Sequence, residues 1–179
     1  MKNRIKISSI ISILLIIINN NLFSQDTNPE YNKNTVFITV GSFGILGGAN
    51  LNYERFIFKT NKSILSSFWL KAGGGYWYEW VDNGTQFYIS AEGLTGHNNS
   101  HIEYGLGITS LYDAESYRIN VSNYESGHES KRPTKWGETD ITAIGNLGYR
   151  YQKPKGHFIF RTGIISTPIA LYISLGVVF

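Results

Sequence analysis

One short stretch of this sequence gathers side chains that could do hydrolytic or metal chemistry. It reads His97-Asn98-Asn99-Ser100-His101-Ile102-Glu103. A serine nucleophile needs a base within hydrogen-bond reach and a third group that orients the base, and His97, Ser100 and Glu103 have those types. A metal site needs three or four converging ligands, for which His97, His101 and Glu103 are the candidates. The chain has no cysteine, which excludes thiol nucleophiles, disulfides and the common zinc fingers.

The spacing within this stretch favours a simpler interpretation. His101 and Glu103 are two residues apart, so on a strand they share one face. Two groups are too few for a metal site, and a histidine paired with a neighbouring carboxylate inside the protein accounts for them. We therefore predict no catalytic residues, no metal and no cofactor.

The N-terminus has the pattern of a secretory signal peptide. Lys2, Arg4 and Lys6 precede a mostly apolar run over residues 7–18, and a small residue, Ser24, stands at a plausible cleavage site. The alternative is an N-terminal anchor helix. We expect residues 1–24 to be the signal peptide and residues 25–34 to be an N-terminal periplasmic segment.

Removal of this segment leaves a mature chain without net charge. Of the 16 Lys and Arg residues, three lie within residues 1–24, whereas none of the 13 Asp and Glu residues do. The remaining 13 cations equal the 13 acids, and no stripe of cations interleaved with aromatic residues is present. Nucleic acid is therefore not an expected partner.

The elements that must position these side chains are strands. Large apolar and small or polar residues alternate most clearly over Ile169–Phe179, and alternation with a period of two is typical of strands. No later run of about 20 apolar residues could form a spanning helix. Seven further segments alternate, over about Thr35–Ser42, Ala49–Phe58, Ser67–Trp80, Thr85–Leu94, Ser100–Tyr112, Thr139–Tyr151 and His157–Ile165. The sequence predicts an all-β fold, an eight-stranded antiparallel up-and-down transmembrane β-barrel over residues 35–179.

The charged residues indicate which face of the barrel meets lipid. One face is nearly free of charge and rich in aromatic residues, and a charge at the middle of a lipid-facing wall costs about 2–4 kcal/mol. The other face carries glycines and both signs of charge, which we expect to form an ion-pair network in a narrow, side-chain-filled lumen. Its members are Glu54, Lys71, Glu79, Glu92, His101, Glu103, Arg150 and Arg161. The alternative is a soluble barrel, in which the apolar face would point inward.

The connectors suggest how such a barrel would be oriented. Short polar turns are expected on the periplasmic side and longer loops outside. The segment of residues 113–138 is long, rich in polar residues and without apolar periodicity. We expect it to be an external loop that could bind an extracellular ligand.

The chain resembles the small outer-membrane β-barrel proteins of Gram-negative bacteria. The resemblance rests on the leader, on the eight alternating segments and on the terminal Tyr172-Ile173-Ser174-Leu175-Gly176-Val177-Val178-Phe179. In that family the barrel assembly machinery reads a terminal aromatic residue with apolar residues at alternate positions before it, which Ile173, Leu175, Val177 and Phe179 match. The resemblance implies a place in the cell outer membrane among its lipids and lipopolysaccharide, with a structural or surface-interaction role.

Two other functions stay open at this point. Some barrels of this kind modify lipid A, and the deacylases among them carry His and Ser two residues apart, with a Glu that orients the His. Here His97 and Ser100 are three apart, and the pattern His-x-Ser does not occur. The soluble alternative would be a secreted, lipocalin-like binder of a small ligand. We expect an open pore in neither case, because eight strands enclose little more than their own side chains.

Overall fold

The computed structural model describes residues 32–43, 46–80, 83–96, 99–128, 133–134, 139–153, 155–167 and 169–179. The segment Tyr31–Phe179 forms one compact unit. The expected signal peptide, residues 1–24, and residues 25–31 of the expected periplasmic segment lie outside the described residues. Within the described ranges, no helix is long and apolar enough to cross a membrane.

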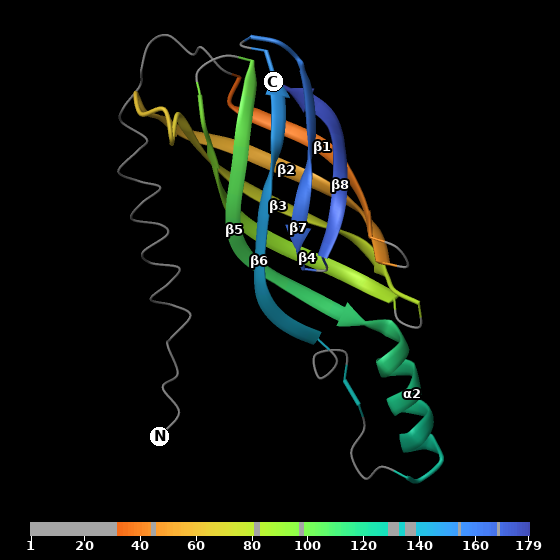
Figure 1. The fold of residues 1–179 in the computed structure, drawn as a ribbon. Coiled ribbons are helices and arrows are strands. Elements are labelled where there is room, and N and C mark those ends of the chain that lie inside the picture. The colour runs from red at the N-terminus through yellow and green to blue at the C-terminus, as the bar shows by residue number, and fades with distance from the viewer. Residues whose placement is uncertain are drawn as a thin grey trace, which may run out of the picture. The chain divides into compact units, whose positions relative to one another are not determined.

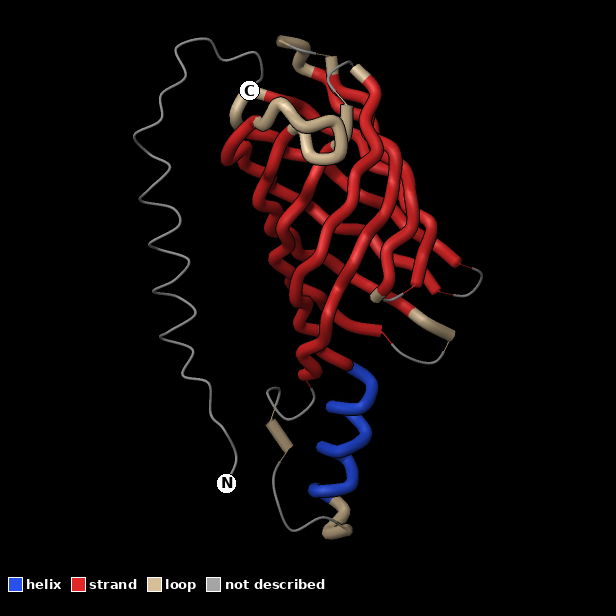
Figure 2. The backbone as a smooth tube through the Cα atoms, turned by 60° about the vertical axis from the view of Figure 1, so that its left-hand side comes forward, coloured by secondary structure: helices blue, strands red, loops and turns tan. Residues whose placement is uncertain are grey.

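Eight antiparallel strands close into a barrel, as the alternation predicts (Figures 1 and 2). Each strand pairs with the next one in sequence, and β8 pairs with β1 to close the ring. The strands are β1 (Asn34–Phe43), β2 (Leu46–Lys59), β3 (Ser67–Tyr78), β4 (Asn83–Leu94), β5 (Ser100–Asp113), β6 (Thr139–Gln152), β7 (Phe158–Ser166) and β8 (Ile169–Val178).

The polar face of each strand points into the barrel and the large apolar face points out. On β8, Tyr172 and Ser174 are buried, whereas the intervening Ile173 is 57% exposed. This is the reverse of a soluble barrel, in which apolar side chains fill the interior. The alternative prediction, an apolar face that lines a ligand cavity, is therefore wrong.

The long connector between β5 and β6 contains a helix that the sequence did not predict. It is α2 (Ala114–Glu125), which begins where Asp113 accepts hydrogen bonds at 2.9 Å from the backbone nitrogens of Glu115 and Ser116. Such a cap satisfies donors that the first turn of a helix leaves unpaired. No residue of α2 is buried. A helix without a buried face needs no stripe of apolar residues, so the sequence of α2 has no apolar periodicity that would predict it.

Connector lengths do not divide the two ends of the barrel as expected. At the end that bears the C-terminus, the turns run over residues 60–66, 95–99 and 153–157. At the opposite end, the connectors over residues 44–45, 79–82 and 167–168 are shorter still, and only that over residues 114–138 is long. The expected contrast of short turns with long loops is wrong, and this one connector alone distinguishes the ends.

Inward-facing glycines let neighbouring strands and interior side chains approach closely. A Cβ on Gly105 would collide with the Glu92 carboxylate, and one on Gly148 would come within 2.5 Å of the Tyr172 hydroxyl. A Cβ on Gly163 would meet backbone, 2.5 Å from the Cα of Gly148. Small residues at these positions are thus required by the narrow interior.

We expect Gly163→Ala to destabilise the barrel by about 1–3 kcal/mol, because a backbone atom cannot move aside as a flexible side chain can. Gly145→Ala is the matched control on β6, since its Cβ would meet no atom closer than 3.6 Å. Urea unfolding of the protein in lipid vesicles measures the free energy of unfolding of both variants. Equal stability of the two variants would contradict the packing argument.

Candidate functional site: paired charges inside the barrel

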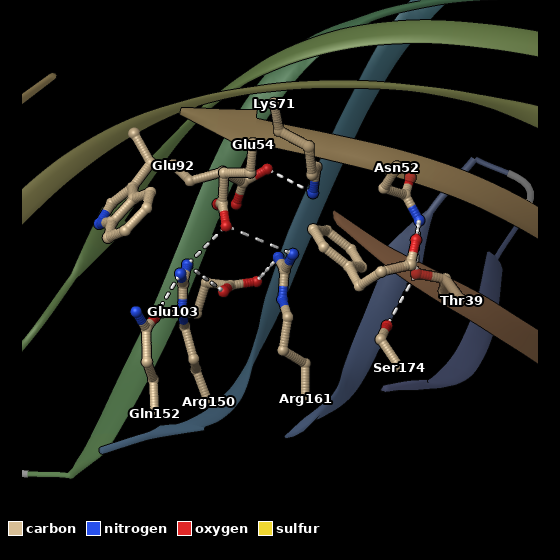
Figure 3. Close-up of polar contacts among 12 residues, drawn as sticks. Thr39, Asn52, Glu54, Lys71, Glu92, Glu103, Arg150, Gln152, Arg161 and Ser174 are labelled. Atoms are coloured by element: carbon tan, nitrogen blue, oxygen red, sulfur yellow. Dashed lines mark hydrogen bonds and ion pairs between the residues drawn. The ribbon is translucent and has the colours of Figure 1, made fainter. Parts of the chain in front are cut away.

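Two arginines that face each other across neighbouring strands form the centre of the interior. Arg150 of β6 and Arg161 of β7 occupy paired positions in the ladder, and both are fully buried. Arg150 donates a hydrogen bond of 2.8 Å to Oε2 of Glu54, and Arg161 donates one to Oε1 of Glu103 (Figure 3). The two guanidinium groups are thus each matched by a buried carboxylate.

These ion pairs connect walls of the barrel that share no ladder. Glu54 lies on β2, which pairs with β1 and β3, yet its partners are on β6 and β7. Each carboxylate also approaches the second arginine, with Glu54 at 3.9 Å from Arg161 and Glu103 at 3.6 Å from Arg150. Like charges opposite each other on a sheet repel, and the two shared carboxylates offset that repulsion.

A third ion pair completes the set. The Nζ of Lys71 lies 2.5 Å from Oε1 of Glu92, which also accepts a hydrogen bond of 2.7 Å from Ser90. The network therefore holds three carboxylates and three cations and has no formal net charge. Charges are retained in a protein interior when they are paired and hydrogen-bonded in this way.

Aromatic rings and an amide support the two arginines. The guanidinium of Arg150 lies 4.4 Å from the centre of the Trp69 ring, and that of Arg161 lies 4.4 Å from the Phe37 ring. Arg150 also donates two hydrogen bonds, of 2.9 and 2.6 Å, to Oε1 of Gln152. Cation–π contacts of this kind are strongest where water is excluded, as it is here.

Beside the charges lies a second layer of neutral polar side chains that the sequence reasoning missed. Asn52 donates a hydrogen bond of 2.9 Å to Thr39, whose hydroxyl lies 2.7 Å from that of Ser174 (Figure 3). Gln86 donates one of 2.8 Å to Asn50. Asn50 and Asn52 alternate with outward residues on the strand that carries Glu54, so the period of two would have identified them.

A small cavity of about 10 Å³ lies inside the described part of the barrel, and its lining includes Lys71, Arg161, Tyr88 and Tyr172. That volume admits roughly one water molecule.

Two of the eight residues expected in the network are not part of these ion pairs. Glu79 is exposed, because β3 ends at Tyr78 and its alternation does not continue to that position. The prediction that Glu79 faces the lumen is therefore wrong. His101 is buried, and its Nδ1 lies 2.6 Å from the carbonyl oxygen of Thr95.

Of the serine and histidines singled out for chemistry, the described Ser100 and His101 lie on opposite faces of β5. Ser100 is exposed and its hydroxyl lies 2.9 Å from that of Tyr149, whereas the neighbouring His101 is buried. His97 lies outside the described residues. Among the residues that the structure describes, no three His, Asp or Glu side chains are arranged to hold a metal ion.

The outer wall carries exposed apolar side chains on all eight strands. Leu106, at the middle of β5, is 71% exposed. The terminal residues Ile173, Leu175, Val177 and Phe179 belong to the same surface. Further members are Ile38, Val40, Leu51, Phe87, Ile89, Ile108, Leu147, Ile164, Ile169 and Leu171. The structure thus places the ion pairs inside the barrel and the large apolar side chains on its outer surface.

Comparisons with known proteins find a likeness in fold. No family model matches the chain, and no curated protein matches it in sequence. Among solved structures, it is similar to the N-terminal β-barrel domain of OprF from Pseudomonas aeruginosa, with a TM-score of 0.50 and 13% sequence identity. The match covers 82% of this chain and 96% of that one. At this identity the likeness shows the fold alone.

We expect Arg150→Met to destabilise the protein by about 3–5 kcal/mol, because it leaves the buried carboxylate of Glu54 without its nearest cation. Adding Glu54→Gln should recover a large part of that loss. The exposed pair between Glu115 and Arg118 is the control, and Glu115→Gln should change stability by at most about 0.5 kcal/mol. Urea unfolding in vesicles measures all three. A double variant less stable than Arg150→Met would contradict the proposed coupling.

Proposed function

We propose that this chain is an integral outer-membrane β-barrel protein with a side-chain-filled lumen and a structural or surface-interaction role. The observation that carries the proposal is the apolar outer wall, found on every strand of a barrel whose ion pairs lie inside. A soluble monomer rarely exposes an apolar patch of more than a few hundred Å². Lipid is the solvent that makes such a wall stable. The likeness in fold to the OprF barrel domain supports the same conclusion.

Exposed aromatic side chains at both ends of the wall support a membrane location. Tyr76, Tyr78 and Trp80 lie at the end that bears α2. Tyr53, Tyr104, Tyr149, Phe158 and Phe179 lie at the end that bears the C-terminus. Amphipathic rings favour the headgroup regions on the two sides of a bilayer. The two groups would then mark where the hydrocarbon begins and ends.

The interior argues against a transport pore. The ion pairs bridge β2 to β6 and β7, and the cavity beside them admits roughly one water molecule. An ion would have to break these contacts in order to pass. We therefore propose that the protein acts through its surface, and that α2 and the connector around it face outward, where they could meet lipopolysaccharide or an extracellular ligand.

The C-terminal strand is the segment that we propose for recognition by the barrel assembly machinery. Ile173, Leu175 and Val177 all point outward from β8, and Phe179 follows the strand. A partner that approached before the barrel closed could contact all four side chains from one side.

Fractionation followed by electrophoresis tests the proposal as a whole. We expect the protein in the outer-membrane fraction, with a gel mobility in SDS that differs between unboiled and boiled samples, because closed membrane barrels resist SDS until they are heated. Recovery from the soluble periplasm without such a shift would overturn the proposal.

Introducing a single charge on the outer wall tests whether that wall contacts lipid. Leu106→Arg should destabilise the vesicle-bound protein by about 2–4 kcal/mol, since it puts a cation near the middle of the lipid-facing wall. Ile119→Arg on α2 is the control, because Ile119 is also exposed but lies on the helix beyond the strands, and it should change stability little. Equal stability of the two variants would contradict lipid contact at Leu106.

A further inference from the structure

The cations that do not belong to the interior are distributed unequally between the two ends of the barrel. At the end that bears the C-terminus, the rim carries six cations, Lys33, Arg55, Lys59, Lys62, Lys153 and Lys155, all of them exposed. The sequence has no Asp or Glu in the turns over residues 60–66, 95–99 and 153–157. Two acids, Asp26 and Glu30, precede β1 in the sequence and lie outside the described residues. This set of six is called the basic rim below.

The opposite end has the reverse balance. Among the described residues of that end are five acids, Glu79, Asp113, Glu115, Glu125 and Asp140, and one cation, Arg118. The interior charges cancel, so they do not alter the difference between the ends. The charges of the described residues are therefore distributed unequally along the barrel.

The residues of the basic rim lie on both sides of the β1–β8 seam that closes the barrel. Lys33 and Arg55 are close together, because the backbone nitrogen of Phe56 donates a hydrogen bond of 2.8 Å to the carbonyl oxygen of Lys33. Next to them, Asn34 and Phe179 exchange two backbone hydrogen bonds. On its other side β8 pairs with β7, and the turn before β7 carries Lys153 and Lys155. The cations thus follow one arc from β6, through β7, β8 and β1, to the turn after β2.

This arc lies at the edge of the apolar wall. Arg55 faces outward on β2, two residues after the exposed Tyr53, whose hydroxyl donates a hydrogen bond of 2.7 Å to Asn34. Phe58 on β2 and Phe68 on β3 stack with their ring centres 5.1 Å apart, next to the turn that joins these strands and carries Lys62. Aromatic residues mark the headgroup level of a bilayer, and long cationic side chains extend toward it.

One residue of the rim occupies a backbone conformation that suits glycine better. Lys155 has φ of 59°, in a turn where Gly156 donates a backbone hydrogen bond of 2.8 Å to Lys153. A lysine in this left-handed region is strained relative to glycine. A role for the ammonium group gives a reason for the lysine at this position.

Together these observations lead us to propose that the basic rim binds the anionic phospholipid headgroups of the leaflet on the C-terminal side of the barrel. The ligand class is a phosphodiester with net negative charge, such as phosphatidylglycerol. Each cation near an anionic membrane surface strengthens such attraction by about fivefold. The inference rests on the proposed membrane location and adds to it a lipid preference on one leaflet.

Native mass spectrometry of the purified protein tests this. The protein is mixed in detergent with equal amounts of phosphatidylglycerol and phosphatidylcholine of the same acyl chains, and the lipids that it retains are counted. We expect phosphatidylglycerol to be retained at least fivefold over phosphatidylcholine at low salt, and less so at high salt. Equal retention of both lipids would overturn the inference.

A matched pair of variants separates the basic rim from net charge. In the rim variant, Lys59, Lys62, Lys153 and Lys155 are replaced by Gln. In the control, Arg118, Lys131, Arg132 and Lys135 of the segment after β5 are replaced by Gln, which gives the same net charge. The rim variant should lose most of the preference and the control should keep it. An equal loss in both would overturn the assignment to the basic rim.

A single substitution separates charge from folding. Lys155→Gly removes one cation and relieves the strained backbone, so it should lower the preference by up to about fivefold without lowering the temperature of the heat-dependent gel shift. An unchanged preference would contradict a role for Lys155.

Three outcomes distinguish a failure of this inference from binding of small anions and from a failure of the proposed membrane location. If inorganic phosphate at matched ionic strength abolishes the preference, the rim is a site for small anions and the lipid assignment is wrong. If the protein inserts into no vesicle, the proposed membrane location fails. If it inserts but retains both lipids equally, only the inference about the basic rim fails.

Discussion

The repulsion between Arg150 and Arg161, on paired positions of β6 and β7, is the constraint around which the interior is organised. Both guanidinium groups are buried, so solvent cannot screen them. Glu54 and Glu103 each contact both arginines and offset that repulsion. One of these carboxylates comes from β2, so the two halves of the chain must meet before the arginines are satisfied. The ion pairs thus couple closure of the barrel to burial of its charges.

The requirement for space follows from that network. Eight strands enclose only enough room for their own side chains. Several of the large interior side chains lie opposite a glycine on the next strand, as Glu92 does opposite Gly105 and Tyr172 does opposite Gly163. Because alternate residues of a strand face opposite sides, the large apolar side chains between these positions point outward and form the apolar wall. The same alternation therefore accounts for the paired charges inside and for the surface that we propose meets lipid.

The period of two predicted the closed eight-stranded fold and the inward position of the six charges that pair, because strand geometry assigns alternate residues to opposite faces. It failed at Glu79, where β3 has already ended, and at α2, a helix that has no buried residue and carries no apolar stripe. Alternation also says nothing about which inward residues meet. The pairing of Glu54 with Arg150 depends on curvature across 96 residues of chain, which no local pattern contains.

The orientation of the strands relative to lipid is the central claim, and site-directed spin labelling tests it most directly. The native chain has no cysteine, so single cysteines can be introduced along β8 at positions 171–175 and 177. In protein reconstituted in vesicles, labels at 171, 173, 175 and 177 should be accessible to oxygen, which concentrates in hydrocarbon. Labels at 172 and 174 should be accessible to neither oxygen nor a water-soluble nickel complex, and Gly176 is left unsubstituted because a Cβ there would collide with the backbone of Val36. Accessibility of the odd-numbered labels to the nickel complex would mean that the apolar wall faces water, and would contradict the account.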